Sequence, residues 1–322
     1  MAIKNNTASS LGKIGILMGG PSSEREISLK SGKAVYQALK DAGVDVITID
    51  ITTSDTEKNT SLIKSQNIDC AFIALHGFFG EDGQIQAILD KLVIPYTGSG
   101  KVASKLAMNK VASRKIIEAA GICVPQYKFI KRFTNVKSLP EQIKFNLPWV
   151  IKPVGHGSSV GLTIIDKRED LGRALKIAFE YDHALVEGYI AGREITVGIL
   201  GNVALAVIEV VPKSRFFDYQ AKYTPGMTDY VVPAKLRDEI AKKVQGVALR
   251  VHQLLGCFGF SRIDMILDRD DVPFVLELNS IPGLTTSSLL PKAARVIGID
   301  FTELCLRLIR FAYEKAEAPL TR

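Results

Sequence analysis

Acidic and amide side chains interrupt two apolar, strand-like runs near the C-terminus, IDMIL and FVLELN. The interrupting residues are Asp264, Glu277 and Asn279. Residues two apart share one face of a strand, so Glu277 and Asn279 point the same way, as do Arg262 and Asp264. If the runs pair as a hairpin, two carboxylates and an amide oxygen gather on one face, and this donor set suits Mg²⁺. The alternative is a solvated face with Arg262 as counter-ion, although FVLELN is very apolar for an exposed strand.

A glycine-rich loop over 155–161 is the second candidate, within WVIKPVGHGSSVGLTIID. Glycines let backbone N–H groups turn toward phosphate oxygens. The loop joins strand to strand, whereas a Walker A loop opens a helix, so it resembles a lid over phosphates. A surface hairpin is the alternative. Lys152 favours the lid, because a lysine in an apolar strand is costly without an anionic partner.

The segment GGPSSEREIS has the spacing of a capping box, Ser23 to Glu26, so a helix is expected to begin there. Glu24 then lies in the first turn, near the ligand edge of a predicted sheet. It could hold a substrate ammonium group. A favourable contact with the helix dipole is the simpler interpretation.

An irregular segment over 214–230, SRFFDYQAKYTPGMTDY, mixes aromatic and charged residues with a Pro-Gly turn. Long segments of this kind often act as lids, and an ordinary surface loop is the alternative. Lys222 and Tyr223 are neighbours, so they would point in different directions in an extended backbone. We expect a mobile loop here.

The first hundred residues alternate strand and helix: KIGILM, a helix ending at Gly43, VDVITIDI, CAFIAL and QIQAILDKL. This order predicts a parallel sheet with helices on its faces. Ligands of such sheets lie at the carboxyl ends of the strands, here Gly19–Ser23 and His76–Gly83. Strand-rich units with long helices follow. We therefore expect a loose tail over 1–11 and an N-terminal substrate-binding α/β domain over 12–103. A central domain with the glycine-rich lid should follow over 104–190, and a C-terminal domain with the hairpin over 191–322.

Composition is that of an ordinary globular protein of 322 residues, 47% hydrophobic and 23% charged. No apolar run has the length of about 18–20 residues that spans a membrane, and the polar start is not typical of a signal peptide. The cysteines are scattered, which favours reduced thiols in the cytoplasm over disulfides or a zinc site. Lys and Arg exceed Asp and Glu by 41 to 34, giving +7. The excess is dispersed, so a small anionic substrate fits it as well as a nucleic acid does.

Together these segments resemble the D-alanine–D-alanine ligases of the ATP-grasp superfamily. The matching motifs occur in the family's order across residues 12–312: GGPSSEREISLKSG, ALHGFFGEDG, IPYTGSG, MNKVASR, VIKPVGHGSSVG, FDYQAKY, GFSRIDMILD and LELNSIPGLTTSSLLP. Eight ordered motifs are far more specific than one glycine loop. The resemblance implies an α/β ATP-grasp fold, in which a parallel-sheet domain precedes two α+β domains that clasp ATP.

The resemblance also implies roles for the nucleotide-binding residues. Asp264, Glu277 and Asn279 resemble the ligands of two Mg²⁺ (or Mn²⁺) ions under the ATP phosphates. Glu187 and Glu194 resemble the residues that meet adenine and ribose. The phosphates would be contacted by three lysines and by the lid: Lys110, Lys152, Lys222, Gly157, Ser158 and Ser159.

The amino-acid site follows from the same resemblance. Glu24 looks like the anchor for the ammonium group of the first D-alanine, and His76 lies where the family contacts its carboxylate. Ser158 and Tyr223 resemble partners that link the lid and the 214–230 loop to Glu24. The resemblance implies an oxyanion site at Arg262 and the Gly283 N–H. It also implies that Ser288 and Leu289 contact the carboxylate of the second D-alanine.

The implied activity is the ATP-dependent ligation of two D-alanine molecules through an acyl phosphate, for peptidoglycan precursors. D-Lactate or D-serine as second substrate is the closest alternative, and Lys222–Tyr223 favours the dipeptide. A regulatory nucleotide-binding protein would not need Asp264, Glu277 and Arg262 together. A dinucleotide oxidoreductase needs GxGxxG and a nucleic-acid binder needs a concentrated basic face, and neither pattern is present. The family implies a cytoplasmic homodimer without a membrane or nucleic-acid partner.

Overall fold

The N-terminal unit is a three-stranded parallel sheet of order β2-β1-β3. Both flanking strands run parallel to β1, so the predicted parallel sheet is confirmed. The computed structural model describes residues 11–135, 139–213 and 226–317. The strands and helices of this unit are β1 (Ile14–Gly19), α1 (Arg25–Asp41), β2 (Val46–Ile51), α2 (Thr56–Ser65), β3 (Cys70–Ile73) and α3 (Gln84–Leu92).

The start of α1 differs from the predicted capping box. Glu24 is the N-cap residue, and no side chain caps the helix. The Ser22 hydroxyl instead accepts a hydrogen bond from the Glu24 N–H at 3.1 Å and donates to the carbonyl of His76 at 2.7 Å. The capping-box prediction was wrong because Glu24, and not Ser23, is the N-cap residue. Glu24 thereby lies at the carboxyl edge of the parallel sheet.

Two helices follow where one helical region was expected. Asn109 ends α4 (Lys101–Met108), and its side chain accepts from Val111 N and Ala112 N at 3.1 and 3.0 Å to begin α5 (Lys110–Ala119). Asparagine favours this position because its side-chain oxygen satisfies N–H groups that have no partner inside the helix. The break places Lys110 in the first turn of α5.

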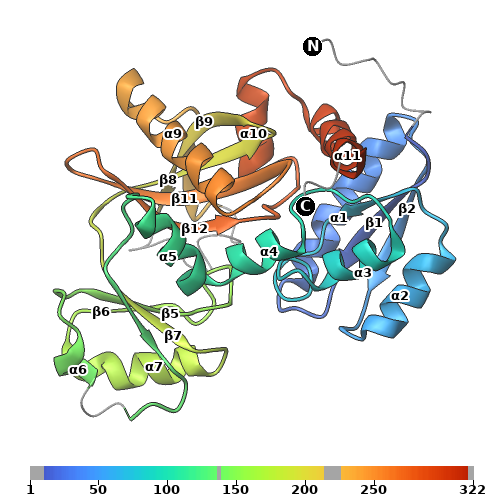
Figure 1. The fold of residues 1–322 in the computed structure, drawn as a ribbon. Coiled ribbons are helices and arrows are strands. Elements are labelled where there is room, and N and C mark those ends of the chain that lie inside the picture. Colours follow the sequence, from blue (N-terminus) through green and yellow to red (C-terminus); the bar gives the residue numbers. More distant parts are fainter. Residues whose placement is uncertain (1–10, 136–138, 214–225, 318–322) are drawn as a thin grey trace.

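The central unit is a four-stranded antiparallel sheet of order β4-β7-β5-β6. Its helix α7 packs on the sheet around the fully buried Trp149. Figure 1 shows this unit as a separate lobe below the C-terminal sheet. Its elements are β4 (Tyr127–Ile130), α6 (Leu139–Gln142), β5 (Trp149–Pro153), β6 (Thr163–Ile165), the 3-10 helix η2 (Arg168–Asp170), α7 (Leu171–Phe179) and β7 (Ala184–Gly188).

The C-terminal unit is a five-stranded antiparallel sheet of order β10-β9-β8-β11-β12. One face packs against α9 and α5, and the other packs with α10 and α11 into the core of the N-terminal unit. Figure 1 shows α11 beside α1. The elements are β8 (Gly192–Leu200), β9 (Val203–Pro212), β10 (Thr228–Val231), α9 (Asp238–Leu254), β11 (Phe260–Asp268), β12 (Pro273–Asn279), α10 (Leu289–Val296) and α11 (Phe301–Glu317).

Residues at the edges of two expected segments belong to ordered structure. The last residues of the 214–230 segment belong to β10, an edge strand paired with β9. Leu11, at the end of the expected tail, is buried, and its carbonyl accepts from the Tyr313 hydroxyl at 2.6 Å. Within the described ranges, no helix is both long and apolar enough to cross a membrane.

His252 in α9 gives a prediction for stability. Burial lowers its pKa from 6.5 to about 4, so the folded protein keeps the ring neutral while the unfolded chain is protonated below about pH 6.5. The free energy of unfolding should therefore fall as pH drops from about 6.5 toward 4, by about 3 kcal/mol in total from this residue. His252→Gln should flatten this decline in denaturant titrations at several pH values. A variant that keeps the wild-type pH dependence would contradict the prediction.

Candidate active site

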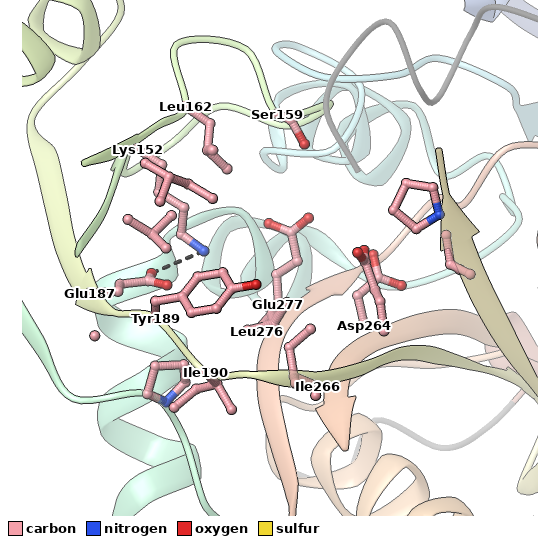
Figure 2. A pocket seen from close by; sticks show the side chains of 18 of the residues that line it. Lys152, Ser159, Leu162, Glu187, Tyr189, Ile190, Asp264, Ile266, Leu276 and Glu277 are labelled. Atoms are coloured by element: carbon pink, nitrogen blue, oxygen red, sulfur yellow. Dashed lines mark ion pairs between the residues drawn. The ribbon is translucent and has the colours of Figure 1, made fainter. Parts of the chain in front are cut away.

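A pocket of about 350 Å³ lies between the central and C-terminal sheets. This volume is within the range of small-molecule sites. Apolar side chains such as Leu162, Ile266 and Leu276 line it together with a group of charged ones. Figure 2 shows Glu277 between the Lys152–Glu187 pair and Asp264. The predicted residues that line this first pocket are Lys110, Lys152, Ser159, Glu187, Glu194, Asp264 and Glu277.

One end of the first pocket holds a buried cluster of charges. Lys152 Nζ and Arg114 Nη2 each lie 2.9 Å from Glu187 Oε1. All three side chains are at least nine-tenths buried. Burial lowers the pKa of Lys152, and Glu187 acts in the opposite direction. Two cations against one carboxylate leave this end of the pocket positive, which suits a ligand that carries negative charge.

The glycine-rich lid is fastened at its first two residues and at its middle. The Gly155 N–H donates to Asp182 Oδ2 at 2.8 Å, and Lys110 Nζ donates to the His156 carbonyl at 2.6 Å. The Ser158 hydroxyl donates to Glu24 Oε1. Ser158 and Ser159 both have positive φ, 54° and 57°, which is uncommon outside glycine and costs free energy. These contacts hold the lid over the site and connect it to the N-terminal unit.

The hairpin pairs in the register that the sequence indicated. Arg262 lies opposite Asn279, and Asp264 lies opposite Glu277, with a bulge after Asp264. Arg262 donates to both oxygens of Asp264 at 2.8 and 2.7 Å, and Asn279 Nδ2 donates to Asp264 Oδ2 at 2.9 Å. Thr196 Oγ1 on β8 donates to Asp264 Oδ1 at 2.6 Å. The Asp264 carboxylate is therefore held in one orientation.

These side chains fit a divalent-cation site. The carboxylates of Asp264 and Glu277 are adjacent on one face of the hairpin, with 13% and 21% of their side chains exposed. The Glu277 carboxylate lies 3.3 Å from Lys110 Nζ. Hard oxygen donors of this kind, next to a pocket for phosphates, are what Mg²⁺ requires. Among the described residues no group of three His, Cys, Asp or Glu side chains forms a metal site, and Asn279, two residues after Glu277 on β12, is the further oxygen donor that the sequence pattern offers.

A second pocket, of about 480 Å³, lies between the N-terminal unit and the hairpin. Glu277 lines both pockets, so they meet at this carboxylate. Arg262 lines the second pocket while its partner Asp264 lines the first. The predicted residues in the second pocket are Glu24, His76, Gly157, Ser158, Arg262, Asn279, Gly283, Ser288 and Leu289.

His76 fastens the N-terminal unit to the turn after the hairpin. Its Nδ1 lies 3.2 Å from the carbonyl of Ile281, and its Nε2 lies 2.9 Å from Ser31 Oγ. A carbonyl can only accept, so Nδ1 carries the proton and Nε2 accepts from Ser31. Burial lowers the pKa of His76 and favours this neutral form. The ring is therefore a fixed dipole in the wall of the second pocket.

Glu81 is a carboxyl group that the sequence motifs left without a role. Its Oε2 accepts from the Gly77 N–H at 2.6 Å, and it lines the second pocket. Burial, followed by the nearby Glu24 carboxylate, raises the pKa of Glu81 to about 8. Of these two acids, Glu24 is the one that the lid contacts through Ser158.

The turn from Ile281 to Ser288 leads into α10. Ser288 is the N-cap residue, and no side chain caps the helix. Ser288 Oγ accepts from the Thr285 N–H at 3.0 Å. The first N–H groups of α10 lie beside the second pocket together with Gly283 and Leu289. Such N–H groups attract carboxylates, because they carry the positive end of the helix dipole.

The placement of the predicted residues differs from expectation in one respect. Gly157 and Ser158, expected on ATP, line the second pocket, whereas Ser159 lines the first. Lys222 and Tyr223 lie outside the described residues. Sequence reasoning missed Arg114, although its spacing of four from Lys110 places both on one face of α5.

The central and C-terminal units are two antiparallel sheets that enclose the first pocket beneath the glycine-rich lid. The second pocket, against the N-terminal α/β unit, meets the first at Glu277. This arrangement defines an ATP-grasp ligase. Family models for the N-terminus and C-terminus of D-ala D-ala ligase match residues 13–99 and 116–310. The chain belongs to the D-alanine–D-alanine ligase family.

Individual relatives agree with this family. The D-alanine–D-alanine ligase of Pelotomaculum thermopropionicum is 45% identical, over 94% of this chain and 97% of the relative. The ligase from Bacillus anthracis, solved in complex with ATP, is similar in structure, with a TM-score of 0.82 and 30% identity over 95% and 99% of the two chains. The VanG D-Ala:D-Ser ligase from Enterococcus faecalis has a TM-score of 0.81 and 33% identity over 94% and 99%.

Proposed function

We propose that the chain joins two D-alanine molecules into D-alanyl-D-alanine at the expense of ATP, through an acyl phosphate, for peptidoglycan precursor synthesis. The observation that carries this proposal is the meeting of the two pockets at Glu277. A nucleotide in the first pocket can there present its terminal phosphate to an amino acid in the second. The identity of the relatives supports D-alanine as that amino acid.

In the first half-reaction, the carboxylate of the first D-alanine attacks the γ-phosphate of ATP, and ADP leaves. Glu24 holds the ammonium group, and His76 lies beside the carboxylate. Lys110 and Lys152 lie along the phosphates, with Ser159 above them and Glu187 and Glu194 at the base and the ribose. When bound, two Mg²⁺ ions held by Asp264, Glu277 and Asn279 offset the phosphate charge.

In the second half-reaction, the amine of the second D-alanine attacks the acyl carbon, and inorganic phosphate leaves. The Arg262 guanidinium and the Gly283 N–H donate to the oxyanion that forms. Ser288 and the Leu289 N–H receive the carboxylate of the second substrate. Closure of the lid through Ser158 and Glu24 excludes water, which would hydrolyse the acyl phosphate. Lys222 and Tyr223 keep the sequence-based roles of phosphate contact and partner to Glu24.

Phosphate release tests this function. Turnover with ATP and Mg²⁺ should require D-alanine, and L-alanine should not replace it. D-Serine and D-lactate should give less product, because the relatives at 45–47% identity are D-alanine–D-alanine ligases. Phosphate release that ignores D-alanine would reject the function. A preference for D-serine as second substrate would place the chain among the D-alanine–D-serine ligases instead.

Location and assembly complete the proposal. We expect a cytoplasmic homodimer without a nucleic-acid or membrane partner, in keeping with the dispersed charge of the chain. Sedimentation at several concentrations would measure the assembly directly.

A further inference from the structure

Arg114 is a buried cation beside the nucleotide pocket that the mechanism above does not use. It is 1% exposed. Its Nη2 lies 2.9 Å from Glu187 Oε1 and donates to the Leu276 carbonyl at 2.9 Å. Its Nε and Nη1 are buried and have no hydrogen-bond partner among the described residues. A guanidinium with two unsatisfied nitrogens is costly to bury, so packing alone does not account for it.

Arg114 determines which oxygen of Glu187 a ligand can reach. Lys152 and Arg114 both contact Oε1, so Oε2 is the oxygen left for a ligand in the pocket that Glu187 lines. The Arg114 guanidinium also lies 5.6 Å from the ring centre of Tyr127, which restricts its movement. Its bond to Leu276 ties it to the strand that carries Glu277. The carboxylate of Glu187 is therefore fixed relative to the metal-binding end of the pocket.

We propose that Arg114 is a positioning residue that selects the nucleotide base, by orienting Glu187 so that Oε2 accepts from an exocyclic amino group. This inference rests on the proposed function. Adenine offers an amino group on its six-membered ring where guanine offers a carbonyl oxygen. An ionised carboxylate accepts from the first and repels the second. Lys152 cannot fix this orientation alone, because its single charged atom sits on a flexible chain.

The test is the binding of MgATP and MgGTP to Arg114→Met and Arg114→Lys, measured by calorimetry without any amino acid. In Arg114→Met the affinity for ATP should fall about tenfold, the effect of one charged hydrogen bond, while that for GTP stays unchanged. The affinity of Arg114→Lys for ATP should lie between those of the wild type and Arg114→Met, because lysine keeps the charge but cannot bridge Glu187 and Leu276. Arg310→Met is the matched control: among the described residues, Arg310 also has a buried Nε without a hydrogen-bond partner, but its guanidinium pairs with Glu303 in α11.

The ratio of ATP affinity to GTP affinity in the variants decides whether Arg114 selects the base. A wild-type ratio of ATP to GTP affinity in Arg114→Met, or equal losses for both nucleotides, would overturn the proposal. If that variant does not fold, Arg114→Lys decides, and a wild-type ratio there overturns it. Failure of the proposed function looks different: the wild-type chain would still prefer ATP in calorimetry but would release no phosphate with D-alanine.

Discussion

Glu277→Gln is expected to lower D-alanine-dependent phosphate release about 1,000-fold, equivalent to roughly 4 kcal/mol of transition-state stabilisation. Glutamine has nearly the shape of glutamate, and a fifth of this side chain is exposed, so the fold should persist. What is lost is the charge at the point where both pockets meet and the ion pair with Lys110, 3.3 Å away. In the proposed mechanism, both the binding of Mg²⁺ and the alignment of Lys110 depend on that charge.

The control for Glu277→Gln is Asp271→Asn, which also replaces a carboxylate by an amide on the same hairpin. Asp271 pairs with Arg237 at 2.7 Å and lies outside both pockets. Its loss should leave turnover within a factor of about two, as for most surface ion pairs. Phosphate release should be measured across a Mg²⁺ titration. If Glu277→Gln keeps wild-type turnover and the same Mg²⁺ dependence, Glu277 is not a metal ligand.

The hairpin was predictable because its chemistry follows a period of two. Alternation alone placed Arg262 with Asp264 and Glu277 with Asn279, and the observed register puts these pairs opposite each other. The parallel sheet was equally accessible, since alternating strands and helices allow few other arrangements. In such segments local pattern and tertiary structure agree.

The other features of the site depend on contacts between segments that are distant in the sequence. The periodicity of a single segment carries no information about such contacts. Burial of Arg114 accompanies its contacts with Glu187 and with the Leu276 carbonyl, which lie 73 and 162 residues further along the chain. The raised pKa of Glu81 comes first from burial and then from the carboxylate of Glu24, which belongs to another segment of the chain. The packing of α10 and α11 into the N-terminal core likewise joins the two ends of the chain. Sequence motifs supplied the candidate residues of the site, and the fold decides which pocket each one lines.

Arg262→Met should separate the two half-reactions. Arg262 lines the amino-acid pocket, so its loss should slow dipeptide formation about 100- to 1,000-fold, the effect of removing an oxyanion donor. Phosphorylation of the first D-alanine should suffer less, because the nucleotide contacts remain. Hydroxylamine, which converts acyl phosphates to hydroxamates, would then trap more hydroxamate per dipeptide than in the wild type.

The stability of this variant can be judged against Arg25→Met. Arg25 makes the same two-pronged contact with Asp50, at 2.8 and 2.7 Å, outside both pockets. Arg262→Met leaves Asp264 with Thr196 and Asn279 as donors, so the carboxylate is not stranded. Should hydroxamate and dipeptide fall in the same proportion, Arg262 acts in the first half-reaction, through its hold on Asp264, and the oxyanion role passes to the Gly283 N–H alone.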